Sequence, residues 1–173
     1  MWFTRDDAVD RRIAEEFGEA LECAAMGELA EWDETPRGWL ARIVVLDQFS
    51  RNVWRGTARA FAQDALARAV AGDGLARGDD QLLPPVERSF AYMPFMHSEA
   101  LEDQERALEL FGKLGAEGAS GPYASNLGNA AQYAKKHRDV IARFGRFPHR
   151  NTILGRDSTP EEAEFLKASG GFM

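Results

Sequence analysis

The sequence predicts an all-α protein built as an antiparallel array of helices. Apolar residues recur at steps of three and four along most of the 173 residues, and no stretch alternates apolar and polar side chains as a half-buried strand does. Glycine, proline and capping residues divide this pattern into short helices. Because paired short helices also build tetratricopeptide solenoids, we expect a tetratricopeptide-like array. Nothing marks a second domain, so residues 1–173 are expected to form a single helical domain.

The first two helices follow from periodicity and caps. An apolar stripe begins at Val9 and ends near Gly27. Thr35 and Pro36 then supply an N-cap and a proline at the first helical position. A second helix is therefore expected to begin there and to end around Asn52.

Glycine and proline divide the middle of the chain. Asp64 is expected to cap a helix that breaks at residues 72–74, which read Gly-Asp-Gly. A short helix after Pro85 is expected to stop at Pro94, because proline lacks the amide proton that a continuing helix needs. A further helix is expected to begin at about Ser98.

The C-terminal part of the chain contains the longest helical pattern. Glycines at 112, 115, 118 and 121 predict a flexible loop ahead of it. The pattern then runs from Tyr123 to Phe144. Thr159 and Glu162 form a capping box that begins the last helix.

Composition excludes several classes of function. A formal net charge of -7 argues against general attraction to nucleic acid or to anionic membranes. No apolar run approaches the roughly 20 residues that cross a bilayer, and the first residues lack the features of a signal peptide. A single cysteine, Cys23, gives neither a disulfide framework nor a thiol-rich metal site. We therefore expect a cytoplasmic protein.

Ionisable residues at positions where the helical period calls for apolar ones are the candidates for function. Asp47 and Arg51 lie four residues apart on the second helix, either as a structural ion pair or as a catalytic acid with its anion clamp. His137 interrupts the apolar stripe of the long helix, a position more typical of a hydrogen-bonded core residue. His97 precedes a helix, where capping and a functional role are both open. His149 stands in an exposed-looking loop and is the strongest functional candidate of the three histidines.

A second signal is local charge. The segment from Phe144 to Asn151 is aromatic and basic and contains no acid, which suits an anion site or a plug at a helix end. Residues 135–156 carry seven lysines and arginines against one acid, and a second arginine series runs from Arg51 to Arg59. If the two segments meet, their forked donors form an anion site for phosphate or carboxylate. The alternative is that the basic segments pair with the acidic helix of residues 99–109.

Standard catalytic signatures are absent. We find no G-x-S-x-G elbow, no H-E-x-x-H and no Walker loop, and residues 137–139 match a kinase triplet only by chance. The three histidines with Asp47 or Glu99 suit a metal by residue type, but their spacing gives no support. The sequence therefore predicts neither a metal site nor a cofactor.

Several motifs together resemble a known bacterial family. They are Leu46 to Asn52, Arg55-Gly56-Thr57, Arg59 to Ala62, His97-Ser98-Glu99, Phe144 to Asn151, and Leu154-Gly155-Arg156. Over nearly the whole chain, from Trp2 to Leu166, they resemble the domain-of-unknown-function family numbered 924. The resemblance implies an all-helical, tetratricopeptide-like fold and supplies no activity or cofactor. Members usually carry a short apolar helix ahead of the Trp-Phe pair, so either the start codon is placed late or that element is missing. Its loss would expose a groove beside Trp2 and Phe3 that favours aggregation or a homodimer.

Three hypotheses of function follow. The first is a binding module with an Arg/His-lined pocket for an anionic small molecule or an acidic peptide, with neither nucleic acid nor membrane as partner. The second is a hydrolase or transferase acting on a phosphorylated or carboxylated substrate with a histidine general acid/base. The third is a protein-interaction scaffold without pocket chemistry. Whether the chain is an enzyme stays open at this point.

The candidate residues divide by role. The candidate catalytic residues are His97, His149 and Asp47, which would orient Arg51 or set the tautomer of a histidine. The candidate ligand-binding residues are Gln48, Arg51, Arg55, Arg146, Arg150 and Asn151.

Overall fold

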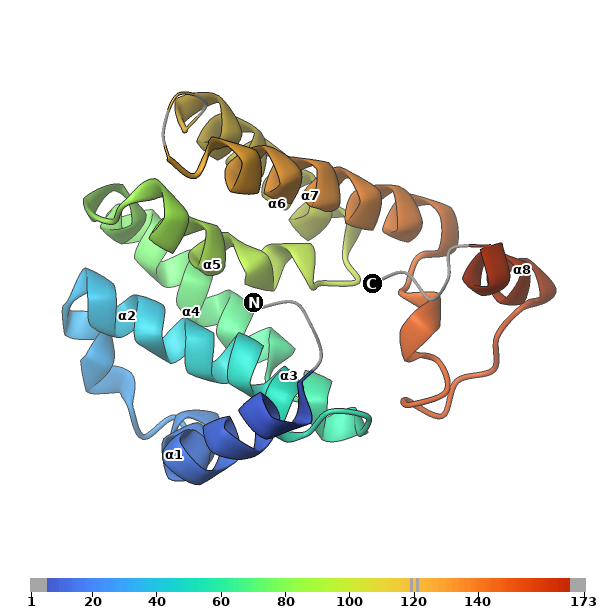
Figure 1. Cartoon of the computed structure of the whole chain (residues 1–173), viewed down its shortest axis with the longest axis horizontal. Coiled ribbons are helices and arrows are strands. Elements are labelled where there is room, and N and C mark those ends of the chain that lie inside the picture. The colour runs from blue at the N-terminus through green and yellow to red at the C-terminus, as the bar shows by residue number, and fades with distance from the viewer. Residues whose placement is uncertain (1–5, 119, 121, 169–173) are drawn as a thin grey trace. The chain divides into compact units, whose positions relative to one another are not determined.

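The computed structural model describes residues 6–118, 120 and 122–168, and within these ranges the chain is helical and has no strand. The α-helices are α1 (Asp7–Ala25), α2 (Pro36–Ile43), α3 (Ser50–Val53), α4 (Asp64–Arg77), α5 (Pro85–Met96), α6 (Leu101–Glu117), α7 (Ala124–Phe144) and α8 (Pro160–Ala168). Short 3-10 helices span Ala30–Glu34, Ala58–Phe61, Asp79–Leu82 and Pro148–Arg150. The predicted all-α helical array is confirmed (Figure 1), and its tetratricopeptide-like arrangement stays a prediction.

Contacts divide the chain into two compact units, which we call unit 1 (Met1–Pro94) and unit 2 (Phe95–Met173). That residues 1–173 form a single domain stays a prediction. Among the described residues, no helix is both long and apolar enough to cross a membrane. Trp2 and Phe3, beside which an apolar groove was expected, lie outside the described residues.

In unit 1, the predicted second helix is one helical run made of three parts. Thr35 caps its start, where the side-chain oxygen accepts a hydrogen bond from the amide of Gly38 at 3.1 Å. After α2 the backbone passes through a π-helical segment, Val44–Phe49, into α3. This run packs against α1, and α2 packs against α4. The buried side chains of Trp39 and Leu46 belong to the core of the unit.

The predicted break at residues 72–74 is wrong, because α4 continues to Arg77. Gly74 lies against the buried indole of Trp39, and a Cβ built at Gly74 would stand 2.1 Å from Cε2 of that ring. Trp39 Nε1 donates to the carbonyl oxygen of Val70 on the same helix at 2.7 Å. The glycine therefore makes room for a core side chain instead of ending the helix.

The predicted stop at Pro94 is also wrong, because α5 reaches Met96. Its last carbonyl groups find a donor outside the helix, in the buried side chain of Gln104. The amide nitrogen of Gln104 lies 2.7 Å from the carbonyl oxygen of Met96 and 2.6 Å from that of Ser98. A side-chain donor of this kind satisfies carbonyls that a helix end leaves without partners.

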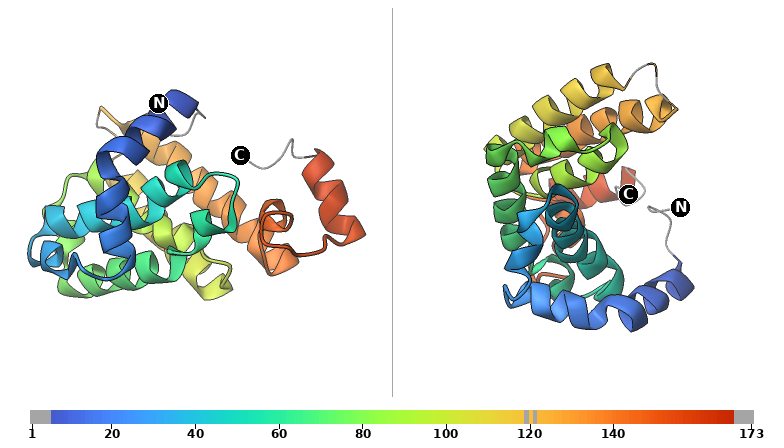
Figure 2. Two further views of the ribbon diagram at one scale, coloured as in Figure 1. Left: turned by 90° about the horizontal axis from the view of Figure 1, so that it is seen from below. Right: turned by 90° about the vertical axis from the view of Figure 1, so that its left-hand side faces the viewer.

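Unit 2 is built on α6 and α7, which lie side by side and run in opposite directions (Figure 2). Phe111 and Leu114 of α6 are buried, as are Leu127 and Ile141 of α7. The predicted glycine-rich loop is shorter than expected, because the glycines at 112 and 115 belong to α6; the glycine at 121 lies outside the described residues.

Candidate functional site

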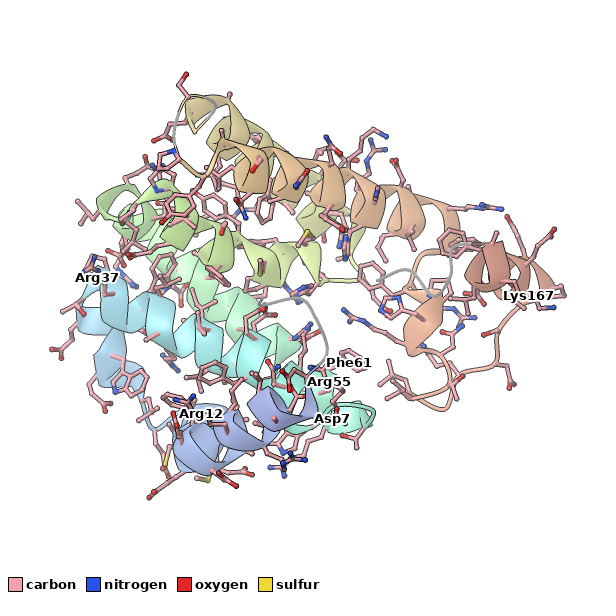
Figure 3. All side chains as sticks on the ribbon, viewed as in Figure 1. Asp7, Arg12, Arg37, Arg55, Phe61 and Lys167 are labelled. Carbon is pink, nitrogen blue, oxygen red and sulfur yellow. The ribbon has the colours of Figure 1, made fainter. Side chains whose placement is uncertain are left out.

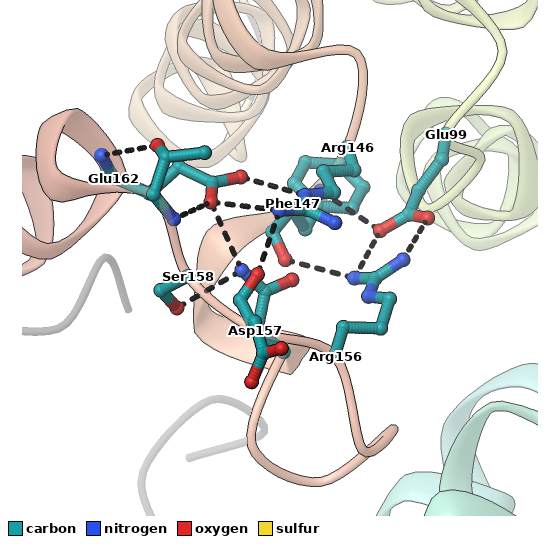
Figure 4. Close-up of polar contacts among 9 residues, drawn as sticks. Glu99, Arg146, Phe147, Arg156, Asp157, Ser158 and Glu162 are labelled. Carbon is teal, nitrogen blue, oxygen red and sulfur yellow. Dashed lines mark hydrogen bonds and ion pairs between the residues drawn. The ribbon is translucent and has the colours of Figure 1, made fainter.

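Two bidentate ion pairs hold the loop that follows α7 (Figure 4). Arg146 donates from Nε and Nη2 to the two carboxylate oxygens of Glu162, at 2.6 and 2.8 Å. Arg156 donates from Nη1 and Nη2 to the two oxygens of Glu99, at 2.7 and 3.0 Å. Paired contacts of this kind are among the strongest that arginine makes and also fix its orientation. The basic loop is therefore an ordered connection.

Glu162 is the centre of the cap that begins α8. Only 2% of its surface is exposed, and its Oε2 accepts from the amide of Thr159 at 2.7 Å. The hydroxyl oxygen of Thr159 accepts in turn from the amide of Glu162 at 3.2 Å, so the predicted capping box is confirmed. The hydrogen bond from Arg146 is the main cause that lowers the pKa of Glu162 to about 2. The buried side chain of Asn151 also donates to Glu162, at 3.3 Å.

Glu99 ties the connection between α5 and α6 to the same loop. Its Oε1 accepts from the amide of Phe147 at 2.8 Å, in addition to the two bonds from Arg156. Burial alone would raise the pKa of Glu99, but the hydrogen bonds from Arg156 and Phe147 outweigh burial and lower it. Glu99 is therefore ionised at neutral pH.

The three histidines of the chain lie together in unit 2, where two of them contact the ring of Phe147 and the third lies beside one of these. The ring centre of Phe147 lies 5.5 Å from that of His137 and 5.5 Å from that of His149. The rings of His97 and His137 are 6.4 Å apart. Arg150 places its guanidinium carbon 4.6 Å from the centre of the Phe147 ring and donates to the carbonyl oxygen of His97 at 3.0 Å. We call these five residues the histidine cluster.

The members of the histidine cluster differ in burial. His137 is 5% exposed, and its Nδ1 donates to the carbonyl oxygen of Tyr133 at 2.8 Å, which confirms its interpretation as a hydrogen-bonded core residue. Because Nδ1 carries the proton, Nε2 of the neutral ring is left as an acceptor. His97 and His149 are half-buried. The expectation that His149 stands in an exposed loop is therefore wrong, because its neighbours Pro148 and Arg150 are buried.

Burial lowers the pKa of His137 to about 4, and the hydrogen bond to Tyr133 opposes this shift only in part. Burial, followed by the charge of Arg150, lowers the pKa of His149 to about 4. Both imidazoles are therefore neutral at pH 7. They can donate and accept hydrogen bonds, but neither holds a proton to deliver as a general acid there. The catalytic roles assigned to His97 and His149 stay predictions.

In unit 1, Asp47 lies in the π-helical segment and is 1% exposed. Arg51 forms ion pairs with Asp47, at 3.2 Å, and with Asp64, at 2.9 Å. Gln48 donates to the carboxylate of Asp47 and lies 3.2 Å from the sulfur of Met93. The predicted inward-reaching ion pair is confirmed. The further role of Arg51 as an anion clamp stays a prediction.

Arg55 holds a carboxylate of α1, at the end of the helix where Asp7 lies (Figure 3). Its Nε and Nη2 donate to Asp10 at 2.6 and 3.0 Å, and Asn52 donates to Asp10 at 2.7 Å. Asp7, Asp10, Arg11 and Arg55 line an open depression of about 320 Å³. Because acids and bases alternate around this depression, it gives no preference to an anion.

The residues predicted as a site fall on both units. Unit 2 brings His97, His149 and Arg150 together, and Arg146 and Asn151 meet at Glu162. Unit 1 joins Asp47, Gln48 and Arg51, and Arg55 binds Asp10. Whether the two basic segments meet stays a prediction.

The alternative that the basic segment pairs with the acidic helix is confirmed inside unit 2. Arg156 binds Glu99, and Arg138 lies 3.6 Å from Glu105. Sequence reasoning missed the carboxylate of Glu162 as a partner, because it had been assigned only to the helix cap. Among the described residues, no group of three or more His, Cys, Asp or Glu side chains is placed to hold a metal ion.

Comparison with known proteins gives a family but no activity. The model of a bacterial protein family of unknown function, DUF924, matches residues 1–170. The solved structure of ATU0120, a protein of unknown function from Agrobacterium tumefaciens, is similar, with 42% identity and a TM-score of 0.88. That similarity covers 96% of this chain and 88% of the other. No curated protein matches the chain. The chain thus belongs to the DUF924 family of bacterial proteins.

Proposed function

We propose that this chain is a binding protein and that the histidine cluster holds the anionic group of a small molecule. One observation carries the proposal. The histidines and Arg150 come from three separate segments, yet His137, His149 and Arg150 lie around the single ring of Phe147, and His97 lies beside His137. Because His97 and His149 are only half-buried, a ligand can reach the cluster from their side.

The chemistry of the cluster favours a carboxylate or phosphate group. A neutral imidazole offers one donor and one acceptor, and Arg150 adds a positive charge. Arg150 is buried, and buried charges are screened less by salt than exposed ones, so this attraction persists at physiological salt. An anion bound beside His149 would favour its protonated form, so binding would raise the pKa of that ring.

The surroundings of the cluster support binding by holding it in advance of any ligand. The ion pair between Arg156 and Glu99 and the bond from Phe147 to Glu99 fix the loop on which His149 and Arg150 stand. A site whose side chains are already ordered loses less conformational entropy on binding. Arg146 contributes to this frame through its ion pair with Glu162.

The test uses the small number of histidines. With ¹³C-labelled histidine, a proton–carbon spectrum contains one ring Cε1–H signal for each of the three rings. Inorganic phosphate and citrate are titrated at pH 7 against sodium chloride of equal ionic strength. We expect saturable shifts of the His97 and His149 signals, and a raised pKa of His149 when phosphate is bound.

Two matched variants separate local from general charge. Arg150→Gln should abolish the saturable shifts. Arg59→Gln removes the same charge from an exposed pair with Glu22 in unit 1 and should leave the shifts unchanged. If phosphate and citrate move the signals no further than chloride does, the cluster is structural and the proposal is wrong. Consumption of para-nitrophenyl phosphate that disappears in His149→Gln would favour the hydrolase hypothesis instead.

A further inference from the structure

The outer face of α7 in unit 2 combines aromatic and basic side chains. Tyr133 is 52% exposed, and the ammonium nitrogen of Lys136 lies 5.1 Å from the centre of its ring. Val140 and Phe144 follow Lys136 at steps of four residues on the same side of the helix, where Val140 is buried and Phe144 is half-buried. We call this face the α7 face. It uses other side chains than the histidine cluster, although Val140 shares a core cluster with Phe147, and Phe144 and Phe165 pack against that core.

The α7 face ends in an open depression of about 240 Å³. Its apolar side chains are Val140 and Phe144, together with Phe165 of α8, and the rings of Phe144 and Phe165 are 5.1 Å apart. Lys136, Arg143 and Asp139 complete the lining, and Asp139 is paired with Lys135 at 2.7 Å. The volume is below the roughly 300–1,000 Å³ typical of small-molecule pockets, so the depression suits one anchoring side chain of a partner.

The charge of α7 is opposite to that of the protein as a whole. The helix carries four basic side chains, Lys135, Lys136, Arg138 and Arg143, against one acid, in a chain whose net charge is -7. Arg143 pairs with Glu161 at 2.7 Å, but both side chains are more than half exposed. Exposed ion pairs contribute little to the stability of a fold. A partner's carboxylate can therefore replace Glu161 beside Arg143 with little loss of free energy. In the part of the chain that the structure describes, no carboxylate lies within ion-pair distance of Lys136.

We propose that the α7 face docks an acidic peptide segment of another protein. One large apolar side chain of the segment enters the depression and packs onto the rings of Phe144 and Phe165. Carboxylates on either side of that anchor lie over Lys136 and Arg143. The apolar contact supplies affinity, and the complementary charge selects the partner and speeds the encounter. This function is additional to the anion site and uses different side chains.

The probe is a fluorescein-labelled peptide with a central tryptophan flanked on each side by three glutamates. Its two reference peptides replace the glutamates by glutamine or the tryptophan by alanine. Fluorescence anisotropy with the full chain should show binding of the acidic peptide and about tenfold weaker binding of either reference peptide. In proton–nitrogen spectra, the backbone signals of residues 133–144 and 161–165 should shift.

Matched charge reversals locate the site. Lys136→Glu should weaken binding of the peptide about fivefold. Lys113→Glu makes the same change at an exposed position of α6 and should change binding less than about twofold. Phe165→Ala should remove the anchor contact while leaving the phosphate-induced shifts of the His97 signal intact, which separates this proposal from the previous one.

Three outcomes would overturn the proposal. The first is equal weakening by the Lys136 and Lys113 variants, and the second is equal binding of the glutamate and glutamine peptides. The third is self-association in light scattering that Lys136→Glu abolishes, since the occupant of the face would then be a second copy of the chain.

Discussion

Acid is expected to destabilise this protein through His137, and also through His149, whose pKa is likewise about 4, before it acts on the carboxylates. Burial holds the pKa of His137 at about 4 in the folded chain, against 6.5 for an ordinary histidine. Between these two values the unfolded chain binds more protons than the folded one. The stabilisation from the neutral ring is therefore complete above pH 6.5 and is lost as the pH falls through 4.

The size of this effect follows from the difference between the two pKa values. Complete protonation of His137 would lower the free energy of unfolding by about 3 kcal/mol. A fall from neutral pH to about pH 5 already removes about 2 kcal/mol of this contribution. A protein of this size is stable by roughly 5–15 kcal/mol, so the loss is measurable. Glu162, with a pKa of about 2 against 4.5, loses its contribution only as the pH falls below 4.5, so pH 5 separates the two groups.

Two measurements check this prediction. Proton–carbon spectra give the ring pKa of each histidine directly in the folded protein. Urea unfolding, followed by far-UV circular dichroism near pH 7 and pH 5, gives the free energy of unfolding. In His137→Asn the amide keeps a donor for the carbonyl of Tyr133 but cannot titrate, so the loss between the two pH values should shrink by about 2 kcal/mol.

Tryptophan fluorescence adds a local control. All four tryptophans precede residue 95, so their emission follows unit 1, whereas the histidine signals follow unit 2. The reasoning would be refuted if His137 titrated near 6.5 in the folded protein. It would also fail if His137→Asn lost as much stability on acidification as the unsubstituted protein.

Two further predictions concern packing and the loop frame, and both are measured by urea or thermal unfolding. Gly74→Ala should cost about 3 kcal/mol because its Cβ would meet the indole of Trp39 at 2.1 Å. Gly72→Ala, on the same helix with no atom within 4 Å of the new Cβ, should stabilise by about 1 kcal/mol, and equal effects would contradict the assigned clash. Glu162→Gln should cost about 2 kcal/mol, because the buried amide can no longer accept with both atoms the bonds that Arg146 and Thr159 donate to the carboxylate. Glu161→Gln, which breaks only an exposed pair, should cost less than about 0.5 kcal/mol, and a similar loss in both variants would argue against the loop frame.

Two helix starts were predictable because their signals are local, whereas the predicted cap at Asp64 is wrong, since Gln63 takes the cap position and makes no side-chain bond there. Thr35 and Thr159 act on amides within three residues, and both caps are present as the sequence predicts. The helix ends at Gly74 and Pro94 were wrong because each depends on a distant residue. Trp39 needs the space that Gly74 leaves, and carbonyl groups at the end of α5 receive hydrogen bonds from a side chain of α6.

In the candidate site too, contacts between residues close in sequence were predictable and contacts between residues far apart were not. Asp47 and Arg51 are one helical turn apart, so their ion pair follows from spacing alone. Arg55 lies 45 residues from Asp10, and Arg156 lies 57 residues from Glu99, and no spacing rule links such positions. The meeting of the three histidines is equally distant in sequence. Residue types predicted which side chains are unusual, and only the fold could give their partners.

The ion pairs of unit 2 decide which arginine is able to serve an external anion. An anion that took Arg146 would leave the buried carboxylate of Glu162 without its partner, at a cost of roughly 3–5 kcal/mol. Arg150 is held differently, by the carbonyl of His97 and the ring of Phe147, and these contacts orient its guanidinium. Its charge also acts on Glu99, whose pKa it helps to lower. The two arginines of the basic loop therefore have different roles. Arg146 maintains the fold, and Arg150 keeps a positive charge beside two half-buried imidazoles, where an anion gains most from it.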